Sequence, residues 1–233
     1  METFVTSKVS LVLHPLMEEI TETGERIKLK AHELFMQYGL KSVSMDDIAN
    51  ALGISKKTVY RFYEDKDALV DDVIATTIEH NQGCCEKDRA ESDNAIHEIF
   101  LAMDFMMEMF HSMNPSLVFD MQKYYPRAFH KFSKHKNDYL YTMIRENISR
   151  GIKEELYRAD LQTDVIARFR VESIMLPFDP AFHTKVKQNL AAIEEELTLY
   201  FLFGMVSPKG YKLAVKYQND RIKKLQADEK KNR

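Results

Sequence analysis

The sequence holds 233 residues with a mass of 27.3 kDa, enough for one large domain or for one small and one medium domain. Only 7 glycines and 6 prolines occur, about half the usual proportion, whereas a β-sandwich or an α/β fold of this length needs many turn residues. The net charge of −3 excludes a protein that coats nucleic acid through bulk positive charge. The composition therefore predicts an all-α protein in which any DNA contact depends on locally placed charge.

Several kinds of site and compartment are disfavoured by the sequence. The two cysteines, Cys84 and Cys85, are adjacent and cannot form a disulfide framework, so we expect a cytoplasmic protein. The uncharged stretch 197–208 is too short to span a membrane. His80 and Cys84 stand one helical turn apart, but no second pair at comparable spacing completes a metal site. No phosphate loop, nucleophile elbow or paired-carboxylate pattern occurs, so we expect no catalytic residue, no metal and no cofactor, and hence no enzyme.

The first predicted helix begins after Thr21 and ends at Gly39. Its apolar residues recur at helical spacing on one face, and Gly39 suits the left-handed residue that follows a helix. Residues 1–20 contain a short apolar run but no cleavage site, which argues against a secretory signal. We therefore expect residues 1–20 to be a flexible or extraneous extension, with Met17 as the alternative start.

Two short helices and a longer one follow, each with a clear start signal. Ser44 with Asp47 three residues later forms a capping-box pattern, and Gly53 ends that helix after about two turns. Ser55 is a good N-cap for the next helix, and Asp65 for the one after it. Two short helices joined by a glycine-containing turn predict a helix-turn-helix domain, which we bound at residues 21–70.

The rest of the chain is predicted to be a larger helical domain, residues 71–226, followed by a disordered basic tail at 227–233. We expect helices over approximately 93–111, 126–151, 164–176 and 190–205, with a final basic helix opening at Pro208. Charge is unevenly spread: 13 acidic and 3 basic residues give residues 64–108 a net charge of −10. Residues 54–63 carry three basic side chains and no acid, so this segment is the expected location of DNA binding.

The helix-turn-helix segment resembles the TetR family of bacterial transcriptional regulators. The resemblance is carried by the runs IANALGIS at 48–55, TVYRFY at 58–63 and KDAL at 66–69, and by the upstream pattern that ends in Tyr38-Gly39. It covers residues 22–75, about a quarter of the chain, in the family's order and spacing. It implies a homodimer that binds a palindromic double-stranded DNA operator through its N-terminal domains. It also implies a repressor whose C-terminal domain binds a small ligand.

Seven residues are expected to contact DNA. If Val59 and Phe62 face inward, the third helix presents its other side to the major groove, where lysine donates to guanine and threonine touches a thymine methyl or a phosphate. We expect Lys57 to read base edges, while the family resemblance implies phosphate contacts for Tyr60 and Lys66. Asp46 is a doubtful base-reading residue unless it accepts from cytosine. The alternative for this helix is that its basic face contacts only solvent. The alternative for Ser44 is that it caps its helix and does not contact DNA. The expected contacts are Ser44, Lys56, Lys57, Thr58, Tyr60, Arg61 and Lys66.

A methionine-rich segment is the expected ligand site. Methionine adapts to irregular apolar ligands, so a cluster of such residues favours the wall of a pocket for a small apolar molecule, although ordinary helical core is the alternative. The expected lining residues are Met103, Met106, Met107, Phe110, Met113, Phe119 and Met121.

Apolar residues in 164–176 and 190–205 offer more surface than one subunit needs, which predicts a dimer. A second function stays open: a helical dimeric interaction protein whose helix-turn-helix no longer reads DNA, since the −10 segment would repel phosphate.

Overall fold

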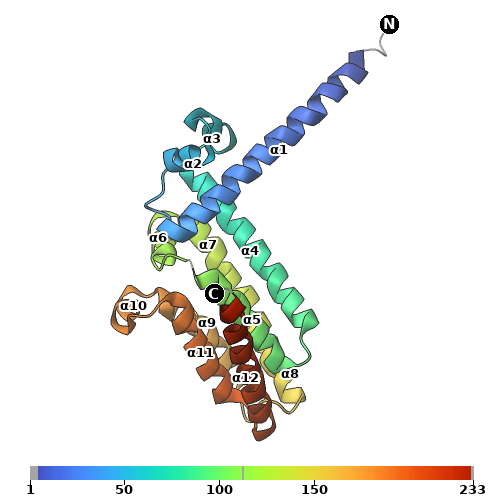
Figure 1. Ribbon diagram of the computed structural model, residues 1–233, viewed down its shortest axis with the longest axis vertical. Coiled ribbons are helices and arrows are strands. Elements are labelled where there is room, and N and C mark those ends of the chain that lie inside the picture. The colour runs from blue at the N-terminus through green and yellow to red at the C-terminus, as the bar shows by residue number, and fades with distance from the viewer. Residues whose placement is uncertain (1–4, 112, 232–233) are drawn as a thin grey trace.

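The computed structural model describes residues 5–111 and 113–231, with side chains for 22–111 and 113–227. Its described part is built from helices without a β-strand, which confirms the all-α prediction (Figure 1). The N-terminal domain comprises three helices and the start of a fourth. These are α1 Val5–Tyr38, α2 Met45–Leu52, α3 Lys56–Phe62 and α4 Lys66–Glu91.

The local signals around the helix-turn-helix act as predicted. The Ser44 side chain accepts from the Asp47 amide and the Asp47 carboxylate accepts from the Ser44 amide, which completes the capping box of α2. Gly53 adopts φ of 65°, the left-handed conformation that glycine tolerates best. Asp65 caps α4 through the Ala68 amide. Ile27, Phe35, Ile48, Val59 and Leu69 are among the fully buried residues of the resulting core.

The ends of the chain were predicted to be unstructured extensions. Helix α1 begins at Val5, earlier than the onset after Thr21 that the periodicity indicated, and α12 Pro208–Lys231 reaches almost to the C-terminus. Residues 1–4 and the side chains before residue 22 and after residue 227 lie outside the described part of the chain. The extension at 1–20, the tail at 227–233 and the domain boundaries between them therefore stay predictions.

The larger C-terminal domain is a bundle in which α5 packs against α11, and α8 against α9 (Figure 1). The predicted helix from Pro126 is continuous to Lys153, although its middle turn at 135–140 is a π-helix. The predicted helix at 164–176 ends earlier, because Pro177 lies in a short 3₁₀ turn and Pro180 opens a separate helix. The bounds are α5 Ala95–His111, α6 Leu117–Tyr124, α7 Pro126–Lys134, α8 Tyr141–Lys153, α9 Thr163–Ser173, α10 Pro180–Val186 and α11 Leu190–Met205.

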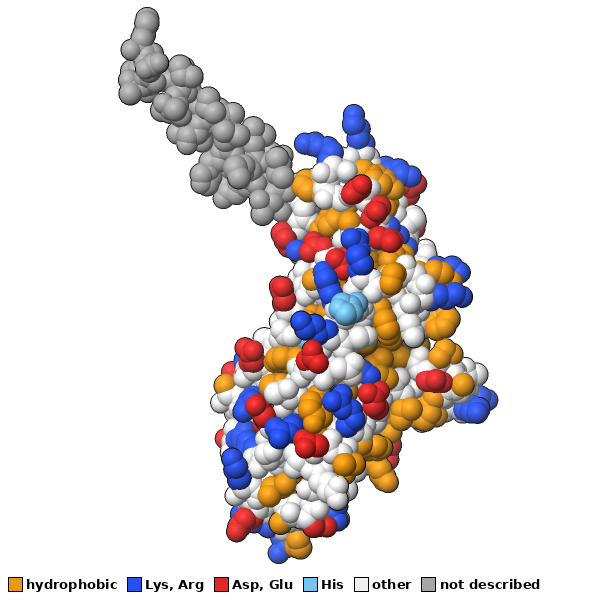
Figure 2. Space-filling model, turned by 180° about the vertical axis from the view of Figure 1, so that it is seen from behind, with side chains coloured by type: hydrophobic (Ala, Val, Ile, Leu, Met, Phe, Trp, Pro, Cys, Tyr) orange, Lys and Arg blue, Asp and Glu red, His pale blue; other side chains and the backbone are white. Residues whose placement is uncertain are grey.

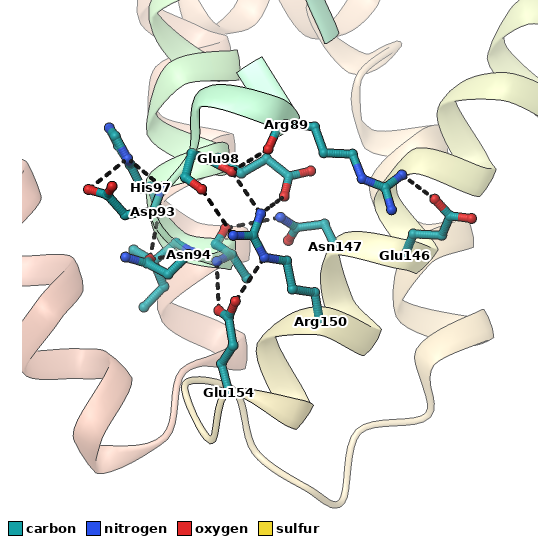
Figure 3. A network of polar contacts seen from close by, with 12 residues as sticks. Arg89, Asp93, Asn94, His97, Glu98, Glu146, Asn147, Arg150 and Glu154 are labelled. Atoms are coloured by element: carbon teal, nitrogen blue, oxygen red, sulfur yellow. Dashed lines mark hydrogen bonds and ion pairs between the residues drawn. The ribbon is translucent and has the colours of Figure 1, made fainter. Parts of the chain in front are cut away.

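Two polar clusters hold the bundle and its connection to the N-terminal domain. At the α4–α5 turn, Arg150 of α8 donates to Glu98 (3.1 Å) and Glu154 (2.8 Å) and also bonds Ser92 (Figure 3). At the junction between the domains, the Asn114 amide donates to the Met36 carbonyl at 2.6 Å.

The turn after α1 is held by the start of α6. The Lys41 amide donates to the Asp120 carboxylate at 3.0 Å. Gly39 has φ of 82°, and a β-carbon there would lie 2.8 Å from Ser116 Oγ. The end of α1 is thus fixed to the loop before α6 and to α6 itself, which positions the helix-turn-helix relative to the bundle.

Candidate functional site

Helix α3 presents one apolar face and one basic face. Ser55 caps it by accepting from the Thr58 amide at 3.1 Å, and this start directs Val59 into the core with no exposed area. Opposite Val59, the side chains of Lys56, Lys57, Tyr60 and Arg61 are exposed. Lys and Arg side chains stand out from this end of the molecule (Figure 2). An exposed helix with this basic face has the dimensions and donors to enter a DNA major groove.

The charges on this face differ in availability. Lys56 forms an ion pair with Asp46 of α2 at 2.8 Å, and this hydrogen-bonded partner raises the pKa of Lys56. Within the described residues, Lys57 and Arg61 make no ion pair or hydrogen bond. Lys57 and Arg61 are therefore the freest donors for DNA, while Asp46 is engaged with Lys56.

Ser44 and Thr58 lie in the same region but use their hydroxyl groups locally. Ser44 Oγ donates to Asp47 at 2.6 Å, and this bond lowers the pKa of the Asp47 carboxyl. Thr58 Oγ1 lies 2.8 Å from Ser55 Oγ. Ser44 is exposed and Thr58 is half-buried, so their DNA contacts stay predictions.

Lys66 is placed differently from the other expected DNA contacts. Its ammonium donates to the Leu40 carbonyl and lies 5.9 Å from the Phe35 ring centroid and 5.6 Å from that of Tyr125. Burial lowers the pKa of Lys66. In this structure the ammonium closes the junction between the N-terminal domain and α6, and it would have to leave the Leu40 carbonyl to reach a phosphate.

A cavity of about 240 Å³ runs through the C-terminal domain beside α5. It is lined by Met106, Phe110, Met113 and Met121, four of the residues expected at a ligand site, and their role in ligand binding stays a prediction. Its wall also contains residues that the sequence reasoning missed, and most of them come from other helices. They are led by Ile74 and Ile78 of α4, Phe105 of α5, and Met143 and Ile144 of α8.

Three of the predicted lining residues are not part of this wall. Met103 and Met107 of α5 instead belong to the core of the bundle, in the cluster that contains Phe100 and Leu202. Phe119 is 45% exposed on α6, with the Lys123 ammonium 5.5 Å from its ring centroid. Because successive residues on a helix are rotated by about 100°, a run of methionines divides between two faces, and only one of them meets the cavity.

The histidines and cysteines near the cavity do not form a reactive or metal-binding site. Cys84 Sγ lies 3.6 Å from His80 Nε2, but no group of three or more metal-binding side chains occurs in the described part of the chain. Cys85 lines the cavity, and burial raises the pKa of its thiol to about 11, so the thiol stays protonated and weakly nucleophilic.

The geometry of α2 and α3 defines the chain as a helix-turn-helix DNA-binding protein. Residues 29–73 match the family model described as bacterial regulatory proteins, tetR family. The chain is 25% identical over 191 residues to the uncharacterized HTH-type transcriptional regulator YvaF of Bacillus subtilis, covering 78% of this chain and 95% of that protein. It is 27% identical over 167 residues to an HTH-type transcriptional regulator of Staphylococcus aureus, covering 67% of this chain and 86% of that protein.

The crystal structure of a TetR-family transcriptional regulator from Agrobacterium tumefaciens has the same fold. It aligns with a TM-score of 0.67 at 14% identity, covering 81% of this chain and all of that one. These matches identify the DNA-binding domain as that of the TetR family and the chain as a DNA-binding transcriptional regulator, which confirms the resemblance inferred from its motifs. Its relatives are regulators and not enzymes. Among the described helices, none is long and apolar enough to cross a membrane.

Proposed function

We propose that the protein is a cytoplasmic repressor that binds a palindromic operator as a homodimer and releases it when a small apolar ligand enters the cavity. One helix, α4, belongs to both sites. Its first turns place Leu69, Val70 and Val73 in the core under the helix-turn-helix, and two turns later Ile78 and Asn81 line the cavity. A ligand that displaces the second half of α4 would therefore move the N-terminal domain.

The dimer is supported by an apolar surface on α9 and α11. Val165, Phe169 and Tyr200 are 60%, 52% and 72% exposed, and a shallow groove between the two helices is lined by apolar side chains. Other apolar residues of these helices, such as Val171 and Phe201, are buried inside the subunit and cannot add to a dimer contact. Two recognition helices in a symmetric dimer would meet successive major grooves about one DNA turn apart.

The test combines three measurements on the full chain. Operator sequences are selected from a random duplex library, the mass is measured by light scattering, and DNA affinity is followed as salt rises. We expect a dimeric mass, a palindromic selected sequence and a steep loss of affinity with salt. A monomeric mass would contradict the dimer. Binding that is weak and insensitive to salt would instead support an interaction protein whose helix-turn-helix no longer reads DNA.

A second arm addresses ligand response. Some compounds should raise the melting temperature by binding the native protein, and these should weaken operator binding. Since coupling is reciprocal, the operator should lower the affinity for the compound by the same factor. A compound that stabilises the protein and leaves operator affinity unchanged would argue against release by ligand.

A further inference from the structure

The wall of the cavity beside α5 is almost entirely apolar, yet it contains five side chains that can carry charge. They come from three α-helices and a π-helical turn, and the remaining lining groups are apolar or neutral. The five are Asp88, Glu98, His135, Lys136 and Arg170. A charge beside an apolar cavity is costly unless an opposite charge or a hydrogen bond compensates it. A charged side chain that has no such partner within the protein is therefore the one available to pair with a ligand.

Three of the five are compensated within the chain. Arg170 of α9 forms an ion pair with Glu194 of α11, and both side chains are buried. Lys136 lies 2.8 Å from the Glu172 carboxylate.

Glu98 is held by the Arg150 guanidinium at 3.1 Å, and Arg150 in turn bonds Glu154 (Figure 3). The two basic groups and Glu98 are thus already paired.

His135 is neutral at physiological pH. Burial lowers the pKa of His135, and its Nδ1 lies 3.2 Å from the Gln82 side-chain amide. It therefore contributes no charge to the cavity.

Asp88 is the exception among the charged lining groups. Its carboxylate makes no hydrogen bond or ion pair to any described residue, and its Oδ2 atom is buried. Burial raises the pKa of Asp88, and the nearby carboxylates of Glu91, Asp104 and Glu98 act in the same direction. The neighbouring Lys87 lowers this pKa but does not offset the rise, and it forms no ion pair with Asp88. A positively charged ligand group would stabilise the ionised carboxylate of Asp88. The surroundings of Asp88 therefore favour a cationic ligand group and disfavour an anionic one.

We propose that the cavity selects a small cationic amphiphile, with an apolar or aromatic body among the methionines of α5 and a protonated amine that pairs with Asp88. This inference rests on the proposed ligand-binding function and names its ligand class. A volume of about 240 Å³ suits a compact molecule with a single ring and a short chain. Fatty acids and other apolar anions are disfavoured, since the two basic lining residues are already paired.

The experiment uses three probes with one apolar body and different head groups: 4-phenylbutylamine, 4-phenylbutanol and 4-phenylbutyrate. Affinities are measured by calorimetry at pH 7 on the full chain, on Asp88→Asn and on Glu86→Gln. Glu86 is an exposed acid on α4 that does not line the cavity, so this control removes the same formal charge without touching the wall.

The wild-type chain should bind the amine about tenfold more tightly than the alcohol, and the acid most weakly, as for one hydrogen bond to a charged group. In Asp88→Asn the amine should fall to within about twofold of the alcohol. Glu86→Gln should keep the tenfold preference. An unchanged affinity for the alcohol shows that the cavity of Asp88→Asn is intact.

Equal binding of amine and alcohol by the wild-type chain overturns the inference, as does a preference that survives in Asp88→Asn or the absence of binding by all three probes. Operator release separates this inference from the proposed function. If the amine binds with the expected preference but the operator stays bound, the ligand class stands and release by ligand fails. If the acid releases the operator and the amine does not, ligand response stands and the cationic class is wrong.

Discussion

The substitution Lys66→Ala tests whether this lysine closes the domain junction or contacts DNA alone. The ammonium donates to the Leu40 carbonyl and lies near two aromatic rings. A hydrogen bond to a charged group contributes about 1.5–3 kcal/mol, and a cation–π contact about 0.5–1 kcal/mol at a partly exposed site. Because Lys66 is only half-buried, solvent reduces these figures, and we expect Lys66→Ala to lower the unfolding free energy by about 1–2 kcal/mol.

The control is Lys57→Ala on the exposed face of α3, which should leave stability within about 0.5 kcal/mol of the wild type. Urea denaturation followed by circular dichroism measures both, and the melting temperature of Lys66→Ala should fall by about 2–8 °C. In the DNA assay, Lys57→Ala should reduce the free energy of operator binding by about 1–3 kcal/mol and relax the base preference at one position of each half-site.

The opposite pattern would refute the structural reasoning. If Lys66→Ala keeps its stability and only reduces the salt slope by about one per subunit, the lysine is a phosphate contact, as the family resemblance implies. A Lys66→Met variant, which retains most of the apolar stem, distinguishes lost packing from the lost hydrogen bond.

Three further outcomes follow from packing and charge. Gly151→Ala should cost about 2–3 kcal/mol by chemical denaturation, because the new β-carbon would lie 2.1 Å from the buried Tyr157 ring, whereas Gly83→Ala, with nothing within 4 Å, should gain about 0.5–1 kcal/mol. The pKa of His135 is lowered in the folded protein, so its contribution to stability is present above about pH 6.5 and is lost as the pH falls toward the folded pKa. His135→Gln lacks this titration. In urea titrations it should therefore lose less stability than the wild type between about pH 7.5 and 5.5. Tyr200→Glu, which places a charge on the apolar face of α11, should give a monomeric mass by light scattering, and a retained dimer would locate the interface elsewhere.

The sequence alone determined the helix-turn-helix and the exposed basic side of its second helix. Ser44, Gly53, Ser55 and Asp65 act through contacts within a few residues along the chain, so their effect is local and does not depend on the rest of the fold. The basic face of α3 followed from the same local logic, because Val59 is the apolar residue that must point inward.

Only the tertiary structure decided which side chains meet the cavity and which charges are free. Helix α5 is apolar around most of its circumference, so its sequence could not indicate that Met106 lines the cavity while Met103 is core. From the sequence, Lys66 is indistinguishable from a free surface lysine. Its contacts with Leu40 and Tyr125, which lie 26 and 59 positions away, exist only in the folded chain. Asp88 is one of 13 acids in its segment, and only Asp88 and Glu98 of these line the cavity. Glu98 is paired with Arg150 of a distant helix, whereas Asp88 has no such partner. Long-range packing, which no local pattern encodes, sets both burial and pairing.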